Sequence, residues 1–195
     1  MKNIALTLSY EGLNFLGYQK TKAGPSIEEE LEKALFQILQ EKPVLQAASR
    51  TDKGVNAFNQ IVNFYCCKDL DLKKMLFSLN QLLPKEIRIR KICTKPLNFH
   101  PTLSARAKEY HYFISSNAAP DPYATYYSWH IPFFLDISIM KKGAQKLIGT
   151  HDFLGFSNQK PSKKDIKTIK TIFDIAIIKK KRSHYNKNKG RQFFI

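Results

Sequence analysis

The sequence predicts an α+β fold in which helices cover one side of a β-sheet. The first half of the chain has the pattern strand, helix, strand, strand, helix, strand. Its expected strands carry apolar residues at every second position, and its expected helices carry them at every third or fourth. The second half begins in a similar way, and 43% of the 195 residues are hydrophobic, which is enough for a packed core.

The first strand and the first helix have clear sequence signals. Residues 2–10 are predicted to form a strand because Ile4, Leu6, Leu8 and Tyr10 alternate. A turn containing Gly12 and Gly17 follows. Ser26 and Glu29 then form a capping box that begins a helix. The apolar face of this helix consists of Ile27, Leu31, Ala34, Leu35 and Ile38.

The rest of the first half repeats this alternation of elements. A short strand over residues 44–48 is expected to lead into a turn at Arg50–Asp52, and the next strand carries Phe58, Val62 and Phe64 on one face. Pro84 ends a second helix, and a half-exposed strand containing Ile87 and Ile89 follows. Residues 95–101 are predicted to be a hinge. We therefore expect two domains, residues 1–98 and residues 99–195.

The second half predicts one further helix between strands. Residues 104–115 are expected to form a strand, and Asp136 is expected to cap a helix whose apolar face is Ile137, Met140, Ala144 and Leu147. A long strand is predicted over residues 169–177, and residues 186–190 resemble the tip of a hairpin. A last strand is expected to begin at Phe193.

Composition excludes several classes of protein. Lys and Arg number 32 against 16 acidic residues, so the net charge is +16, which favours a polyanionic partner such as nucleic acid. Neither the three cysteines nor the histidines have the spacing of metal ligands, so no metal site is indicated. The sequence contains no phosphate-binding motif, so no nucleotide cofactor is indicated either. No apolar stretch approaches the length of a membrane span. We expect a cytoplasmic protein with no metal, no cofactor and no membrane partner.

The segment Ser49-Arg50-Thr51-Asp52-Lys53-Gly54 is the strongest candidate for chemistry. It places a carboxylate two residues from Arg50, whose charge would help to keep Asp52 ionised, as a nucleophile requires. The alternative is an ordinary surface turn, in which Asp52 bonds to the backbone and Gly54 supplies a positive φ. Asp52 is the predicted catalytic residue.

Two basic segments are candidates for RNA contacts. Alternation along the predicted strand 104–115 would place Arg106, Lys108, Tyr110 and Tyr112 on one face, where they could bind an unstacked base and its phosphates. Alternatively, the tyrosines belong to the core and the cations are solvated. Between Lys160 and Arg191 there are 12 Lys or Arg and 2 Asp, which is either a folded phosphate-binding surface or a solvated tail.

These motifs, taken in order, resemble the tRNA pseudouridine synthase A family. The segment from Ser49 to Ala57 resembles the family's catalytic Gly-Arg-Thr-Asp-x-Gly-Val-His-Ala. Tyr10-Glu11-Gly12 with Phe15, Gly17, Tyr18 and Gln19 is similar to its first-strand motif, in which Trp usually stands at the position of Tyr18. Further collinear matches are Phe99-His100-Pro101, Ser104-Ala105-Arg106 with Tyr110-His111-Tyr112, and Gly149-Thr150-His151-Asp152-Phe153 with Phe156.

The resemblance implies a cofactor-free isomerase that converts uridine to pseudouridine in the anticodon arm of tRNA, at family positions 38 to 40. Asp52 would be the nucleophile, Arg50 would pair with it, and Tyr110 would stack on the flipped base. Arg106 and Lys108 are further substrate-binding candidates. The family fold implies two similar ferredoxin-like or RRM-like halves that share an antiparallel sheet, with helices on one face, a basic cleft between the halves, and a homodimer.

The sequence also departs from the family pattern. Ser49 stands for Gly and Asn56 for His, and both changes are expected to be tolerated. The family's later Met-Val-Arg segment is absent, so we expect a truncated second half with uncovered apolar surface on Phe173, Ile175 and Phe194. We also expect low stability and weak or no catalysis. The alternative function is that of a non-catalytic basic RNA-binding protein or a degenerate synthase.

Overall fold

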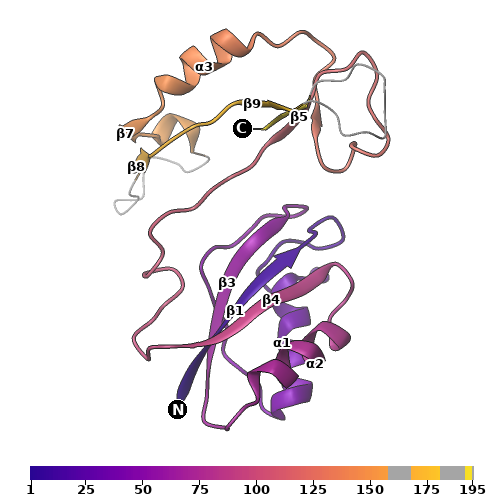
Figure 1. Cartoon of the computed structure of the whole chain (residues 1–195), viewed down its shortest axis with the longest axis vertical. Helices are drawn as coiled ribbons and strands as arrows, with labels where there is room; N and C mark the ends of the chain where they lie inside the picture. Colours follow the sequence, from indigo (N-terminus) through magenta and orange to yellow (C-terminus); the bar gives the residue numbers. More distant parts are fainter. Residues whose placement is uncertain (158–167, 181–191, 195) are drawn as a thin grey trace. The chain divides into compact units, whose positions relative to one another are not determined.

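The structure is a computed structural model of the chain, and it describes residues 1–157, 168–180 and 192–194. The chain divides into two compact units, Met1–Lys108 and Glu109–Ile195. Figure 1 shows the helices and strands of both units. The domain boundary expected after residue 98 stays a prediction.

The first unit is built on a four-stranded antiparallel sheet with strand order β2-β3-β1-β4. Its elements follow the chain as β1 (Lys2–Tyr10), α1 (Ile27–Leu39), β2 (Gln46–Ala47), β3 (Ala57–Cys66), α2 (Leu72–Leu82) and β4 (Ile87–Lys95). This succession and strand order are those of a ferredoxin-like βαββαβ unit. The expected order of elements in the first half is therefore confirmed, and so is the α+β class.

Both helices pack on one face of this sheet and form the core with it (Figure 1). Ser26 is the N-cap of α1, as expected, and its Oγ accepts a hydrogen bond from the Glu29 N–H at 3.3 Å. Asp71 caps α2 in the same manner. The fully buried side chains come from every main element and include Ile4, Leu6, Leu8, Tyr18, Ile27, Leu31, Leu35, Phe64, Leu79 and Ile87.

The expected face of β3 needs one correction. Val62 and Phe64 are buried, but Phe58 is 57% exposed. Leu8 is opposite Gln60 while Tyr10 is opposite Ala57, so Phe58 and Asn59 together face the single residue Ser9. This β-bulge removes Phe58 from the alternation that would have buried it.

The second unit contains shorter elements. They are β5 (Phe113–Ser115), β6 (Trp129–His130), α3 (Ile137–Gln145), β7 (Gly149–Asp152), a 3₁₀ turn η1 (Leu154–Phe156), β8 (Ile169–Ile172), β9 (Ile178–Lys180) and β10 (Gln192–Phe194). One sheet has the order β6-β5-β10-β9, and β7 pairs with β8 in a second. Asp136 caps α3 as predicted, with its Oδ1 accepting from the Ser138 and Ile139 N–H groups.

Two long strands predicted in the second half are wrong. Only Phe113–Ser115 of the expected strand 104–115 is a strand, because β10 pairs with these three residues and residues 104–112 have no ladder partner among the described strands. The expected strand 169–177 is interrupted because its first part pairs with β7, whereas the following strand, β9, pairs with β10. The predicted hairpin tip at 186–190 and much of the basic segment 160–191 lie outside the described residues.

Large apolar side chains are exposed in the second unit. Phe173, expected to be uncovered, is 72% exposed, whereas Ile175 is half-buried; the Phe194 side chain lies outside the described part. None of the residues of α3 is buried, although its expected apolar face is its less exposed one. Among the described residues there is no helix with the length and apolar character needed to cross a membrane.

Candidate active site

Asp52 lies on the loop that joins β2 to β3, at one end of the first unit's sheet. The Val55 N–H donates to the Asp52 carbonyl oxygen at 3.2 Å, and Gly54 has a φ of 78°, so the chain turns sharply just after Asp52. The Asp52 side chain is exposed, and within the described residues its carboxylate has no hydrogen bond or ion pair. The alternative in which this carboxylate caps the turn is therefore not what the structure adopts.

Two glycines hold the Asp52 loop by close backbone contact. A Cβ on Gly17, whose φ is 107°, would lie 2.5 Å from the Thr51 carbonyl oxygen, and a Cβ on Gly12 would overlap the Val55 backbone. The Tyr18 N–H donates to the same Thr51 oxygen at 3.0 Å. The turn after β1 therefore positions the loop through main-chain atoms, which only glycine permits at this distance.

Three side chains brace the same loop. The Tyr10 hydroxyl lies 2.9 Å from Thr51 Oγ1, and burial raises the pKa of Tyr10 above its ordinary value. Asn56 Oδ1 accepts from the Gly12 N–H at 2.7 Å. The buried Gln60 side chain donates from Nε2 to the Ser49 carbonyl oxygen. Sequence reasoning missed the role of Gln60, although a polar residue at a core-facing strand position was the available signal.

The predicted substrate-binding residues are only partly brought together. Lys108 donates from Nζ to Ser49 Oγ at 3.2 Å, which places this cation at the start of the Asp52 loop. Arg50 and Arg106 are exposed, and no ion pair between Arg50 and Asp52 is present in the described part of the chain. The expected pairing of Arg50 with Asp52 is thus not seen in this structure.

Tyr110 belongs to the second unit and is 67% exposed. Tyr112 is exposed as well, so in this structure neither ring is part of a core. The face that residues 106–112 were expected to share is not formed, because this segment is not a strand. A contact between Tyr110 and the Asp52 loop stays a prediction.

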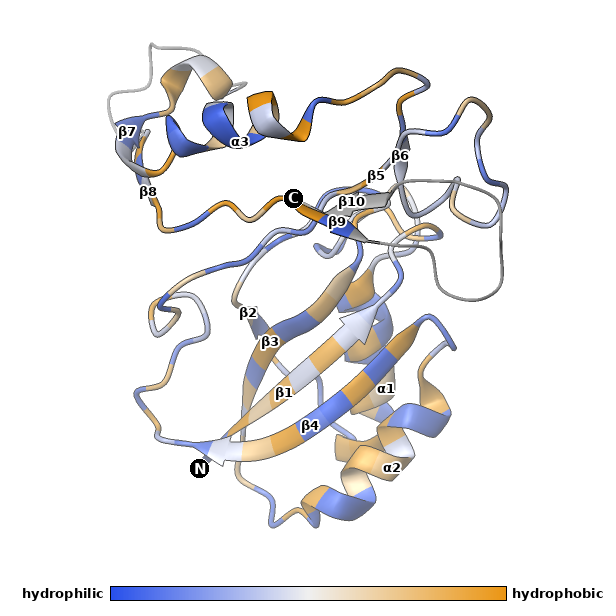
Figure 2. Ribbon diagram, turned by 45° about the horizontal axis from the view of Figure 1, so that its top comes forward, coloured by the Kyte–Doolittle hydropathy of each residue, from blue (hydrophilic) through white to orange (hydrophobic). Residues whose placement is uncertain are grey.

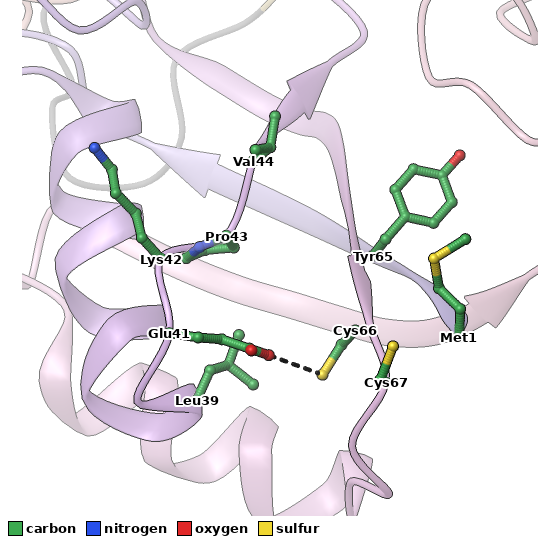
Figure 3. A pocket seen from close by; sticks show the side chains of 9 residues that line it. All are labelled: Met1, Leu39, Glu41, Lys42, Pro43, Val44, Tyr65, Cys66 and Cys67. Atoms are coloured by element: carbon green, nitrogen blue, oxygen red, sulfur yellow. Dashed lines mark hydrogen bonds between the residues drawn. The ribbon is translucent and has the colours of Figure 1, made fainter.

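One cavity of the first unit lies at the opposite end of β3 from the Asp52 loop. It has a volume of about 350 Å³ and is lined by Met1, Leu39, Glu41, Lys42, Pro43, Val44, Tyr65, Cys66 and Cys67 (Figure 3). Cys66 is the last residue of β3, whereas the Asp52 loop precedes the first, so the ten-residue strand separates the two by roughly 30 Å. Among the described residues, there is no group of three or more His, Cys, Asp or Glu side chains that could hold a metal ion.

Comparison with known proteins finds relatives that are named tRNA pseudouridine synthase A. No protein-family model matches the chain. The chain is 50% identical to tRNA pseudouridine synthase A 2 of Protochlamydia amoebophila over 161 residues. This aligned region covers 82% of this chain and 62% of the relative. Over 179 residues the chain is 37% identical to tRNA pseudouridine synthase A of Thermoanaerobacter sp. (strain X514), which covers 92% of this chain and 72% of the relative.

A third relative, tRNA pseudouridine synthase A of Chlamydia felis, is 36% identical over 184 residues. The chain spans 62% and 60% of the lengths of two Protochlamydia amoebophila synthases that it matches. The similarity to these three relatives extends over 82% to 92% of this chain. On these grounds the chain belongs to the tRNA pseudouridine synthase A family.

Proposed function

We propose that this chain converts uridine to pseudouridine in tRNA and that Asp52 is the nucleophile. The exposed Asp52 carboxylate supports this proposal most directly, because it is held on a loop fixed by backbone contacts and is not used to stabilise the fold. A net charge of +16 favours a polyanionic substrate. The names of the relatives agree with that substrate class.

In the proposed reaction, the uridine leaves its stack and Asp52 attacks it, forming a covalent adduct. The bond between ribose carbon 1′ and uracil nitrogen 1 breaks, and the uracil turns while it remains bound. A new bond then forms between carbon 1′ and uracil carbon 5, and the bond between Asp52 and the nucleotide breaks, which regenerates the carboxylate. Carbon 5 loses its proton and nitrogen 1 gains one, so the atoms balance as an isomerisation, and we propose that it needs no cofactor.

The other predicted residues have supporting roles in this proposal. Arg50, Arg106 and Lys108 would contact phosphates around the opened nucleotide, and Lys108 already lies at the Ser49 end of the loop. Tyr110 would stack on the flipped base and assist removal of the carbon 5 proton. We further propose that the substrate region is the anticodon arm, that two similar halves around a basic cleft bind it, and that the working form is a cytoplasmic homodimer.

The test is release of tritium from tRNA labelled at carbon 5 of uridine. We expect release by the wild type and a loss of at least about 10³-fold in Asp52→Asn, because a lost nucleophile is not compensated by binding. Asp69→Asn is the matched control: Asp69 is exposed, and within the described residues its side chain pairs with the exposed Lys2. That variant should release tritium at the wild-type rate.

Binding separates the two proposed functions. Asp52→Asn should bind tRNA within about twofold of the wild type, since it removes a negative charge from a surface that attracts phosphates. Wild-type protein that binds tRNA but releases no tritium would contradict the enzymatic proposal and leave a non-catalytic RNA-binding protein.

A further inference from the structure

Phe58 is an aromatic residue that the fold turns outward next to the Asp52 loop. It is the second residue of β3, and the bulge opposite Ser9 leaves its ring 57% exposed. The following core-facing residues of the same strand, Val62 and Phe64, are fully buried. Bulges redirect side chains and are over-represented beside active sites. The exposed ring is therefore a feature of the backbone path and not a failure of packing.

A second bulge, on the other side of β1, places a cation near the backbone of Phe58. Thr7 is opposite Lys91 while Leu8 is opposite Ile89, so Arg90 is the additional residue in β4. Its guanidinium Nη1 lies 3.5 Å from the Phe58 carbonyl oxygen, and therefore reaches across β1. Both bulges occur at the end of the sheet that carries the Asp52 loop.

The sheet face opposite the helices is basic along β4. The register places Arg88, Lys91 and Lys95 on this face, opposite Ser9, Thr7 and Asn3, while Ile87 and Ile89 face the core. Figure 2 shows this alternation of hydrophilic and hydrophobic residues along β4. Positions 61, 63 and 65 of β3, which share this face, are Ile, Asn and Tyr and carry no acidic charge. Charge complementarity therefore favours an anionic ligand here.

We propose that Phe58 and Arg90 form a subsite for an unpaired nucleotide of the substrate RNA. The Phe58 ring stacks on a base next to the uridine that reacts at Asp52, and the Arg90 guanidinium contacts the phosphate of that nucleotide. Aromatic rings bind single-stranded RNA in this way without selecting a particular base, and an adjacent cation adds salt-dependent affinity. This inference rests on the proposed function, because it takes tRNA as the ligand.

The first experiment measures binding of the full chain to an unmodified tRNA transcript by fluorescence anisotropy at fixed salt. Phe58→Ala is expected to weaken binding by about tenfold, and Phe58→Trp to retain it. Arg90→Ala is expected to weaken binding and to reduce the slope of log affinity against log salt by about 0.7 to 0.9. Matched controls are Phe77→Ala and Lys74→Ala, since both side chains are exposed on α2, and they should bind like the wild type.

A second measurement reports the stacking itself. The tRNA anticodon loop is transcribed with 4-thiouridine and irradiated, and the crosslinked peptide is identified by mass spectrometry. We expect a crosslink at Phe58 that is lost in Phe58→Ala.

The outcomes distinguish this inference from the proposed function. Wild type that does not bind tRNA overturns both. Binding by Phe58→Ala and Arg90→Ala within twofold of the wild type, or a crosslink elsewhere with none at Phe58, overturns the subsite alone. A change in sedimentation of Phe58→Ala without a change in RNA affinity also overturns it, because a protein would then be the occupant of this surface.

Discussion

At the scale of single residues, the position of the Asp52 loop depends on two glycines that have no Cβ atom. Gly12 and Gly17 keep the space in which the backbone of Thr51 and Val55 lies, and neither position can accept a methyl group without moving the loop. The Asp52 side chain makes no hydrogen bond or ion pair within the part of the chain that the structure describes. In the proposed function, Gly12 and Gly17 position the loop, and Asp52 supplies the reactive group.

Gly17→Ala is expected to lower tritium release by at least tenfold and to destabilise the first unit by about 2 kcal/mol. The reasons are its φ of 107° and the Thr51 oxygen 2.5 Å from the new Cβ. Gly143→Ala is the matched control, because no heavy atom lies within 4 Å of its Cβ and it sits within α3. That control should gain about 0.5 to 1 kcal/mol by thermal denaturation. Unchanged activity in Gly17→Ala would contradict the positioning role of the glycine turn.

Tyr18→Phe is expected to raise the free energy of unfolding by about 1 kcal/mol. The Tyr18 side chain is buried, and its hydroxyl has no hydrogen-bond partner among the described residues, so the wild type bears the cost of removing that hydroxyl from water. Urea denaturation of both proteins measures the difference. A destabilised variant would show that the hydroxyl has a partner, such as a bound water.

Tyr18 should also make the stability of the first unit depend on pH in the alkaline range. Burial, followed by the charge of Glu28, raises the pKa of Tyr18 well above its ordinary range. The unfolded chain releases this proton near pH ~10 while the folded chain keeps it, so stability is full below that pH and falls as the pH rises beyond it. Thermal midpoints between pH 8 and pH 11 should show a shallower fall in Tyr18→Phe. An unchanged slope would assign the effect to other groups, such as Tyr10.

At the scale of elements, local sequence signals succeeded where the partner was also local. The Ser26 capping box and the Asp136 cap each use neighbours three residues away or fewer, and both helices begin where expected. The alternation in β1 was sufficient because this strand is paired on both sides over its whole length. These features of the fold could be predicted from the sequence.

Strands whose limits depend on distant partners could not be predicted. Residues 104–112 alternate like a strand, but β10 pairs only with Phe113–Ser115. The exposure of Phe58 depends on a register shift against Ser9, which no pattern within β3 reveals. Likewise, the motif predicts Asp52 as the nucleophile, and this stays a prediction, whereas the contacts of Gln60 and Lys108 with Ser49 became visible only in the fold.

Ser26→Ala is expected to destabilise the first unit by about 1 kcal/mol, because the Glu29 N–H would lose its acceptor in the buried first turn of α1. Ser26→Thr keeps a hydroxyl at the cap and should retain most of that energy. Chemical denaturation with both variants measures the difference. Equal stability of the Ala and Thr variants would show that this hydrogen bond contributes nothing.

At the scale of the whole molecule, burial is unevenly divided between the units. The large core cluster lies entirely within Met1–Lys108, whereas the buried apolar residues described in the second unit are Ile114 and Ile177. The sequence has no lack of apolar residues there, but many of their side chains are exposed, including Phe133, Phe134 and Phe156. The two units are therefore expected to differ in stability.

Hydrogen exchange should reveal this difference. Amides of β1 and β3 should exchange at least about 100-fold more slowly than those of β5 and β8, because few buried contacts oppose opening of the second unit. Mass spectrometry of peptides from both units measures the rates. Equal protection would mean that the second unit is covered in solution.

The hydrogen bond between Asn56 and the Gly12 N–H has a consequence for acidic conditions. The family motif has His at the position of Asn56. A protonated imidazole cannot accept a hydrogen bond, so a histidine at this position would lose the hydrogen bond from the Gly12 N–H below pH ~6.5. The amide of Asn56 does not titrate, and its oxygen remains an acceptor. The Asp52 loop of this chain should therefore keep its position at mildly acidic pH. In Asn56→His, the loop should lose this hydrogen bond at acidic pH.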